Sequence, residues 1–201
     1  MKKVPLAFLF FLVTLGYSEA QFTKMGGGLS YGTGVYFRGE DFEISHKTGN
    51  PAITLKGIYE ISLPLHISPS INIFMPRVTK QDFNEVNDRQ SISAFLFDIN
   101  AHYVFNSLDR FEFYGLSGIN ITLLRNRYKY EYPTGEPGEV FSSSETVLGL
   151  NIGAGSYMKL TEQLDAFAEL KYIIGKRDQL MLTAGVLLNL DWLKKNENKI
   201  F

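Results

Sequence analysis

The feature that most constrains this chain is an alternation with a period of two that returns about eight times between Lys24 and Trp192. From Met25 to Phe37 the odd positions are mainly apolar, whereas the even positions are mostly glycine or small polar residues. Successive side chains of a strand point to opposite faces, so this period indicates strands with one apolar face. We therefore expect an all-β fold.

The first twenty residues have the features of a cleavable export signal. Two lysines precede an apolar run from Leu6 to Leu15 that is too short to span a bilayer, and small residues precede Gln21. We expect residues 1–20 to be a signal peptide and residues 21–201 to form one β-barrel domain. No later segment approaches ~18 consecutive apolar residues, so a membrane protein of this sequence must cross with strands. A net charge of -1, with dispersed basic residues, argues against a nucleic-acid partner.

The strand candidates are joined by connections that alternate in length. The connections after the first, third and fifth strands are long and polar, and the others are short. Short turns on one side and long loops on the other are typical of bacterial outer-membrane barrels. The strands are expected at 24–37, 51–62, 66–76, 91–105, 111–124, 146–158, 165–174 and 180–192, the long loops at Arg38–Asn50, Arg77–Gln90 and Arg125–Glu145, and a tight seventh hairpin at Gly175–Gln179.

These patterns predict an eight-stranded antiparallel up-and-down transmembrane β-barrel in the outer membrane. Both termini are expected in the periplasm. The partners expected are outer-membrane lipid and lipopolysaccharide, the barrel assembly machinery during insertion, and an unidentified protein, and we expect a monomer.

The composition of the two faces indicates which one meets lipid. Bulky apolar residues share one face of most strands, opposite a face rich in Gly, Ser, Thr and Asn, as expected for a narrow interior filled by its own side chains. Apolar residues that nevertheless fall on the predicted inner face are Ile58, Leu96, Leu116, Phe167 and Leu187. Aromatic residues near strand ends favour the headgroup boundary, or else pack in hairpins: Tyr36, Phe37, Phe74, Phe105, Phe111, Phe113, Tyr157, Tyr172 and Trp192.

Charged residues on the inner face need partners, because unpaired charges in a confined interior are costly. We favour a structural network of salt bridges and hydrogen bonds that plugs the interior over a path for protons or ions. The residues expected in this network are Lys56, Glu60, Asp98, His102, Glu112, Glu169 and Lys171.

Several segments resemble the small outer-membrane β-barrel family of Bacteroidetes, a porin-like group. They are Gly57–Glu60, Ser68–Asn72, Asp98–Tyr103, Tyr114–Asn120 and Leu150–Gly155. The likeness covers most of the mature chain and implies the architecture, but it implies little about function because fold does not fix function.

No catalytic, cofactor or metal site is expected from the sequence. His66 and Ser68 have the spacing of the histidine and serine of lipid A deacylases, and both side chains would share one strand face. They lie beside an inner turn, however, whereas lipid A lies in the outer leaflet. We therefore expect a non-enzymatic protein with a structural or surface-interaction role; the alternatives are a component of a type IX-like export or assembly machine and a lipid A-modifying enzyme.

The third long loop is the expected site of any surface recognition. Its tyrosines offer large contact area at low entropic cost, and its arginines can bind carboxylates or phosphates. The alternative is that this alternation is the strand itself, projecting beyond the membrane with basic side chains near anionic headgroups. The residues in question are Arg125, Arg127, Tyr128, Tyr130 and Tyr132.

Overall fold

The computed structural model describes residues 22–33, 50–62, 64–83, 86–131 and 140–190. Strands dominate this part of the chain, and every pairing between them is antiparallel. No helix within it has the length and apolar character needed to cross a membrane. The strands are β1 (Lys24–Gly32), β2 (Asn50–Ser62), β3 (Leu65–Phe74), β4 (Arg77–Phe83), β5 (Val86–Leu108), β6 (Phe111–Glu131), β7 (Val140–Lys159), β8 (Leu164–Gly175) and β9 (Gln179–Asn189).

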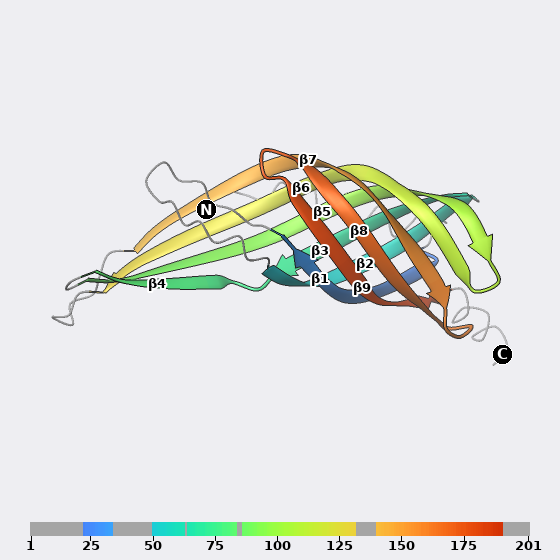
Figure 1. The fold of residues 1–201 in the computed structure, drawn as a ribbon, viewed down its shortest axis with the longest axis horizontal. Helices are drawn as coiled ribbons and strands as arrows, with labels where there is room; N and C mark the ends of the chain where they lie inside the picture. The colour runs from blue at the N-terminus through green and yellow to red at the C-terminus, as the bar shows by residue number, and fades with distance from the viewer. Residues whose placement is uncertain (1–21, 34–49, 63, 84–85, 132–139, 191–201) are drawn as a thin grey trace, which may run out of the picture.

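The sheet closes into a barrel because β3 pairs with both β2 and β5 (Figure 1). β3 and β4 are consecutive segments of one wall strand, since both pair with β5 and only Met75 and Pro76 separate them. Proline has no backbone N–H to donate, which accounts for the interruption. Eight strands therefore surround the barrel, and the predicted eight-stranded antiparallel fold is confirmed.

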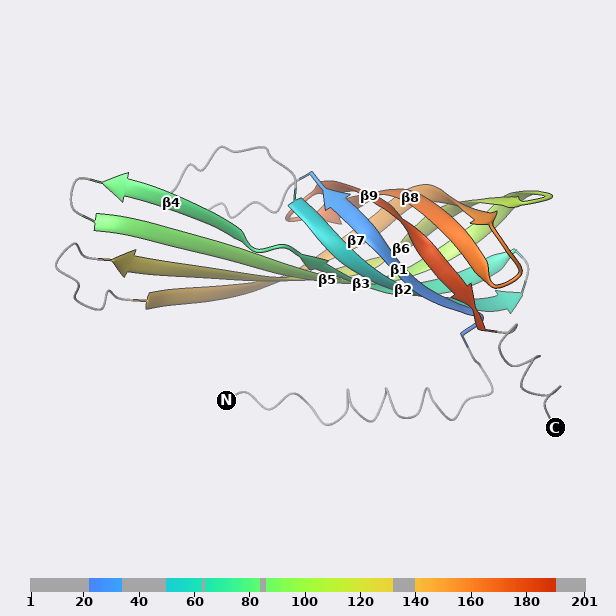
Figure 2. The ribbon, with the colours of Figure 1, turned by 90° about the horizontal axis from the view of Figure 1, so that it is seen from below.

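Part of the sheet continues beyond the barrel as an open, four-stranded projection, which we call the sheet extension (Figure 2). It consists of β4 with residues 86–94 of β5, 125–131 of β6 and 140–146 of β7. β7 first meets β8 at Gly149, opposite Gly175, and β4 pairs only with β5 among the described strands. The sheet extension therefore has two free edges in the described part of the chain.

Two predicted loops are therefore wrong for most of their length. Residues 77–83 and 86–90 are strand, and so are 125–131 and 140–145. The prediction failed because these segments are mostly polar and have no regular apolar face, since they contact neither the acyl chains nor the packed barrel interior along most of their length. The tight hairpin at Gly175–Gln179 is confirmed. The first predicted loop lies outside the described residues, except for its last residue, Asn50, which begins β2.

Three of the short connections lie at the end of the barrel opposite the sheet extension, and the two ends are named here the turn end and the extension end (Figure 1). Short turns join β2 to β3, β5 to β6 and β7 to β8, as predicted. Lys24, where β1 begins, pairs with Asn189, where β9 ends, so both ends of the barrel wall lie at the turn end.

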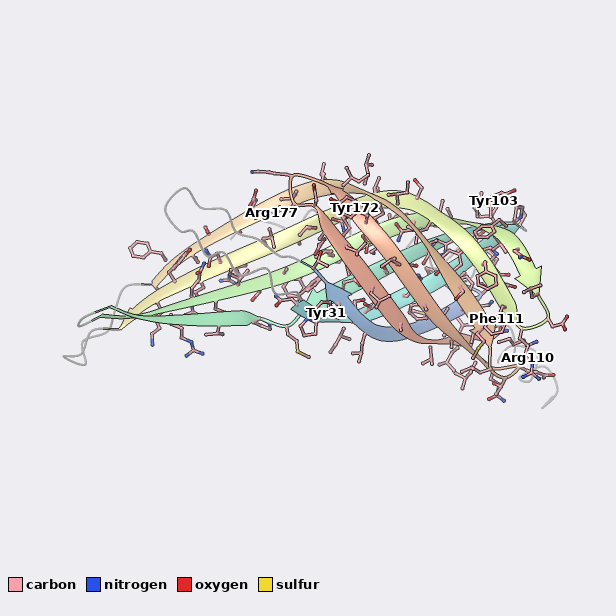
Figure 3. All side chains as sticks on the ribbon, in the orientation of Figure 1. Tyr31, Tyr103, Arg110, Phe111, Tyr172 and Arg177 are labelled. Carbon is pink, nitrogen blue, oxygen red and sulfur yellow. The ribbon has the colours of Figure 1, made fainter. Side chains whose placement is uncertain are left out.

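An exposed apolar belt surrounds the barrel (Figure 3). Its outward side chains include Leu148, which is 71% exposed, and members on every strand of the wall. So large a continuous apolar surface is stable only where lipid covers it. Other members are Leu29, Ile53, Leu55, Ile71, Phe95, Phe97, Ile119, Ile121, Leu123, Leu150, Ile152, Leu170, Leu182, Val186 and Leu188.

Exposed aromatic side chains lie near both ends of the belt. Tyr103, Phe105 and Phe111 lie toward the turn end, and Tyr31 and Tyr172 toward the extension end (Figure 3). Two of the predicted boundary aromatics are wrong, because Phe74 and Tyr157 point into the barrel and are 2% and 3% exposed. The prediction considered only that these residues are near strand ends. Their positions in the alternation place both side chains on the inner face. Tyr36, Phe37 and Trp192 lie outside the described residues.

Candidate functional site

Two apolar clusters fill the ends of the barrel interior, the lumen. The cluster at the extension end comprises Ala52, Phe74, Ala94, Leu96, Leu124, Val147, Ile173 and Met181. The cluster at the turn end comprises Ile58, Val104, Tyr114, Leu116, Tyr157, Phe167 and Leu187. All five apolar residues that the alternation placed on the inner face belong to these clusters, so their predicted inward position is confirmed.

Glycine makes room for the largest of these side chains. Gly155 lies opposite Tyr114 in the pairing of β6 with β7, and a Cβ atom at Gly155 would collide with the Tyr114 hydroxyl group. The small residues on the inner face thus accommodate the aromatic rings that fill the lumen.

A polar layer between the two clusters is centred on Asp98 of β5. Its carboxylate accepts a hydrogen bond from Lys171 Nζ at 2.6 Å and from Ser70 Oγ at 3.2 Å. Three amide side chains also donate to it: Asn72 at 2.8 Å, Asn120 at 2.7 Å and Asn151 at 2.9 Å. These donors come from β3, β6, β7 and β8, so one buried carboxylate connects five strands of the wall.

Glu169 of β8 is the second buried carboxylate of the polar layer. It forms an ion pair with Lys56 and accepts a hydrogen bond from the Tyr114 hydroxyl at 3.1 Å. His102 Nε2 lies 3.8 Å from Glu169, and its Nδ1 lies 2.7 Å from the Tyr157 hydroxyl. The His102 ring also stacks on Tyr114, with 4.3 Å between centroids.

The structure thus gathers five of the seven residues expected in the lumen network and sets two apart. Glu60 lies at the turn end, 3.5 Å from Lys24, which also pairs with Asp165 at 3.0 Å. Glu112 has one carboxylate oxygen that is buried without a hydrogen-bond partner among the described residues. Sequence reasoning missed the four uncharged residues that complete the Asp98 shell, although their inward alternation positions mark them: Ser70, Asn72, Asn120 and Asn151.

His66 and Ser68 point into the lumen and are 2% and 0% exposed, so they face away from lipid. Neither the imidazole nitrogens of His66 nor the Ser68 hydroxyl has a hydrogen-bond partner in the described structure. An imidazole that activates a serine lies within hydrogen-bond reach of its hydroxyl, whereas His66 and Ser68 form no hydrogen bond with each other in the described structure. Across the residues that the structure describes, no three His, Cys, Asp or Glu side chains are grouped to hold a metal ion.

The predicted recognition residues are divided between the two faces of the sheet extension. Arg125 and Arg127 are exposed on the face that continues the apolar belt. Tyr128 lies on the opposite face, where the Gln90 side-chain amide donates to its hydroxyl at 2.7 Å. Tyr130 is in β6 opposite Asp88, but its side chain lies outside the described structure, and so does the whole of Tyr132.

The β8–β9 hairpin is attached to the base of the sheet extension through Glu145. This side chain accepts hydrogen bonds from Lys176 at 2.8 Å and from Arg177 at 2.5 Å. The hydrogen bonds from Lys176 and Arg177 lower the pKa of the Glu145 carboxyl from its ordinary value. Glu145 lies beyond Leu148, the outermost exposed apolar residue of the belt on β7, and is therefore in water.

Comparisons with known proteins agree with this architecture. Neisserial surface protein A matches with a TM-score of 0.53 at 14% identity, over 83% of this chain and 96% of that one. The N-terminal β-barrel domain of Pseudomonas aeruginosa OprF matches with a TM-score of 0.50 at 15% identity, over 83% and 97%. A major outer membrane protein of Thermus thermophilus matches with a TM-score of 0.50 at 10% identity, over 82% and 98%. At these identities the likeness shows the fold alone.

No curated protein matches the chain. The model of one protein family, described as the outer membrane protein beta-barrel domain, matches residues 4–193. This match covers nearly the whole sequence and agrees with the closed barrel and its apolar belt. The chain therefore belongs to the outer membrane protein beta-barrel domain family, and its place is the outer membrane.

Proposed function

We propose that this protein is a non-enzymatic barrel that holds the sheet extension outside the cell as a contact surface. The observation that carries the proposal is that β5, β6 and β7 continue past the apolar belt as strands, without a break in register at the barrel rim. A sheet supported by a barrel wall is a rigid platform, and its outward face and the edges that are free in the described part of the chain are available for contact.

Orientation is part of this proposal. Outer-membrane barrels place short turns in the periplasm and longer connections outside the cell. The turn end therefore faces the periplasm, together with Lys24 and Asn189 at the two ends of the barrel wall. From the sequence resemblance we also propose that the protein comes from a member of the Bacteroidetes.

The lumen supports a structural rather than a catalytic or conducting role. Asp98 and Glu169 connect strands around the barrel, and apolar clusters lie on both sides of them. The lumen position of His66 and Ser68 favours the contact role over lipid A modification, because a lipid substrate lies outside the wall. A part in a protein export machine differs from this proposal only in the identity of the partner.

The test is to remove the sheet extension while keeping the barrel. Replacing residues 78–91 and 126–143 by Asn-Gly turns reconnects Arg77 with Ile92 and Arg125 with Ser144, which are paired in the intact sheet. A photo-crosslinking residue at Ser144, retained in both proteins, reports partners in living cells. We expect the shortened barrel to keep its heat-dependent gel migration and to lose its protein crosslinks.

Replacement of Asp109 and Arg110 at the turn end by Asn-Gly is the matched control and should leave the crosslinks unchanged. Crosslinks that persist in the shortened barrel would overturn the proposed contact surface.

A further inference from the structure

The outward face of the sheet extension carries a group of cations just beyond the apolar belt. On β5 and β6 the outward positions have odd numbers, as Phe97 and Ile121 show, and the pairing of these strands has no register shift between Asn87 and Val104. The same parity therefore places three exposed arginines and a lysine on this face, which we call the basic face: Arg89, Arg125, Arg127 and Lys129.

The residues directly opposite Arg125 and Arg127 on the neighbouring strands are serines. Arg125 lies between Ser93 and Ser144, and Arg127 lies between Ser91 and Ser142. No ion pair joins Arg89, Arg125 or Arg127 to an acidic side chain in the described structure. The basic face therefore presents guanidinium groups flanked by small hydroxyls, a combination that suits phosphate oxygens.

Two further cations meet across strands on the basic face, where Arg89 is directly opposite Lys129 in the pairing of β5 with β6. They add positive charge beyond Arg125 and Arg127, and this charge attracts an anion.

The position of the basic face relative to the apolar belt indicates which anion it meets. Arg125 is two residues past Leu123, an exposed member of the apolar belt, and Arg127 is four residues past it. A strand rises ~3.3 Å per residue, so Arg125 and Arg127 lie about 7 and 13 Å along the strand beyond that side chain. The same face that contacts acyl chains thus passes directly into the layer of phosphorylated headgroups.

We propose that the basic face binds the phosphate groups of outer-leaflet lipid A and so fixes the sheet extension at the membrane surface. This inference rests on the proposed position of the sheet extension outside the cell. It assigns Arg125 and Arg127 to the membrane rather than to a protein partner, and leaves the sheet edges of the described structure for other contacts.

The experiment measures lipid binding to the full-length mature barrel in detergent micelles by native mass spectrometry. The probes are bisphosphorylated lipid A and the same lipid with both phosphates removed. Arg125→Gln with Arg127→Gln removes two cations from the basic face. Arg110→Gln with Lys159→Gln, two exposed residues at the turn end, removes the same charge as a matched control.

We expect the Arg125 and Arg127 variant to bind bisphosphorylated lipid A about tenfold more weakly than the wild type, with a further loss on adding Arg89→Gln. The dephosphorylated lipid should bind all variants equally, and the control should match the wild type. Equal binding of bisphosphorylated lipid A by the basic-face variant, or equal weakening in the control, would overturn the inference and leave this face to a soluble acidic partner. Binding in micelles is independent of the crosslinking at Ser144, so the two proposals fail separately.

Discussion

Asp98 is the residue on which the polar layer of the lumen depends. Its carboxylate accepts hydrogen bonds from side chains on four other strands, and one of these donors, Lys171 at 2.6 Å, also forms an ion pair with it. Removing one partner of a buried ion pair leaves the other charge uncompensated, which costs about 3–5 kcal/mol, whereas removing both is often nearly neutral.

We therefore expect Asp98→Asn to lower the free energy of unfolding by about 3–5 kcal/mol. Combining it with Lys171→Met should recover most of that loss. Urea titration of the barrel in lipid vesicles measures both, with Glu162→Gln in the β7–β8 turn as the exposed control. Additive effects of the two substitutions would contradict the pairing.

Leu150 and Val186 test the outward face at the level of single residues. They are 59% and 50% exposed on the apolar belt. Arginine at a lipid-facing position near the middle of the bilayer costs roughly 2–4 kcal/mol, because the charge loses its hydration.

Leu150→Arg or Val186→Arg should therefore destabilise the barrel folded in lipid vesicles by that amount. Ser143→Arg, exposed on the same strand as Leu150 but in the sheet extension and opposite the uncharged Asn126, should have little effect. Equal effects at Leu150 and Ser143 would show that the apolar belt does not face lipid.

At the scale of the strand, the alternation predicted the strand segments that contact lipid and missed the strand segments that are in water. β1, β2, β8 and β9 were predicted to within a few residues where they are described, because one face of each is apolar and the other small or polar. β4 and the outer parts of β5, β6 and β7 were assigned to loops, since hydration removes the contrast between their faces. Only the alternation of Arg125, Arg127 and Lys129 with tyrosine signalled a strand there, and the structure confirms that strand, while the contact of its basic side chains with headgroups stays a prediction.

The sequence predicted which residues point into the lumen but not which of their side chains pair with each other. Parity placed Leu96 and Lys56 inside the barrel, but which amide meets which carboxylate depends on strand tilt and register around the closed barrel, and a single strand carries no information about these. Glu60 and Glu112 share the parity of the network but lie too near the turn end to join Asp98.

The β8–β9 hairpin offers a test at the scale of an element. Hydrogen bonds from Lys176 and Arg177 lower the pKa of Glu145, so its ionised form is favoured in the folded state. A lowered folded-state pKa stabilises the protein above the ordinary glutamate range, and that stabilisation is lost as the pH falls through the lowered pKa.

Glu145→Gln should therefore be less stable than the wild type at neutral pH, and the difference should vanish under acid conditions. Because the Glu145 side chain is 24% exposed, we expect a difference below about 1 kcal/mol. Urea titrations across a pH series measure it, and a difference that persists in acid would show that the hairpin is not held by this charge.

The whole molecule is a filled barrel that supports a sheet, and the filling has a functional consequence. An interior of eight strands is just wide enough for its own side chains. Two apolar clusters and the buried ion pairs occupy it here. We expect the protein to give no steady conductance in planar lipid bilayers, with an open porin as the positive control. Steady conductance steps from the purified barrel would contradict a structural lumen.

The most direct test of the central claim, a barrel in the outer membrane with its sheet extension outside, uses the absence of cysteine from the sequence. Single cysteines at Ser143 in the sheet extension, Leu150 in the apolar belt and Asp109 at the turn end can each be labelled with a membrane-impermeant maleimide. All three positions are exposed on the protein itself, so differences in labelling report the membrane. The account predicts that intact cells label Ser143→Cys only, that permeabilised cells also label Asp109→Cys, and that Leu150→Cys reacts only after extraction and unfolding. Labelling of Asp109→Cys but not Ser143→Cys in intact cells, or ready labelling of Leu150→Cys in membranes, would contradict it.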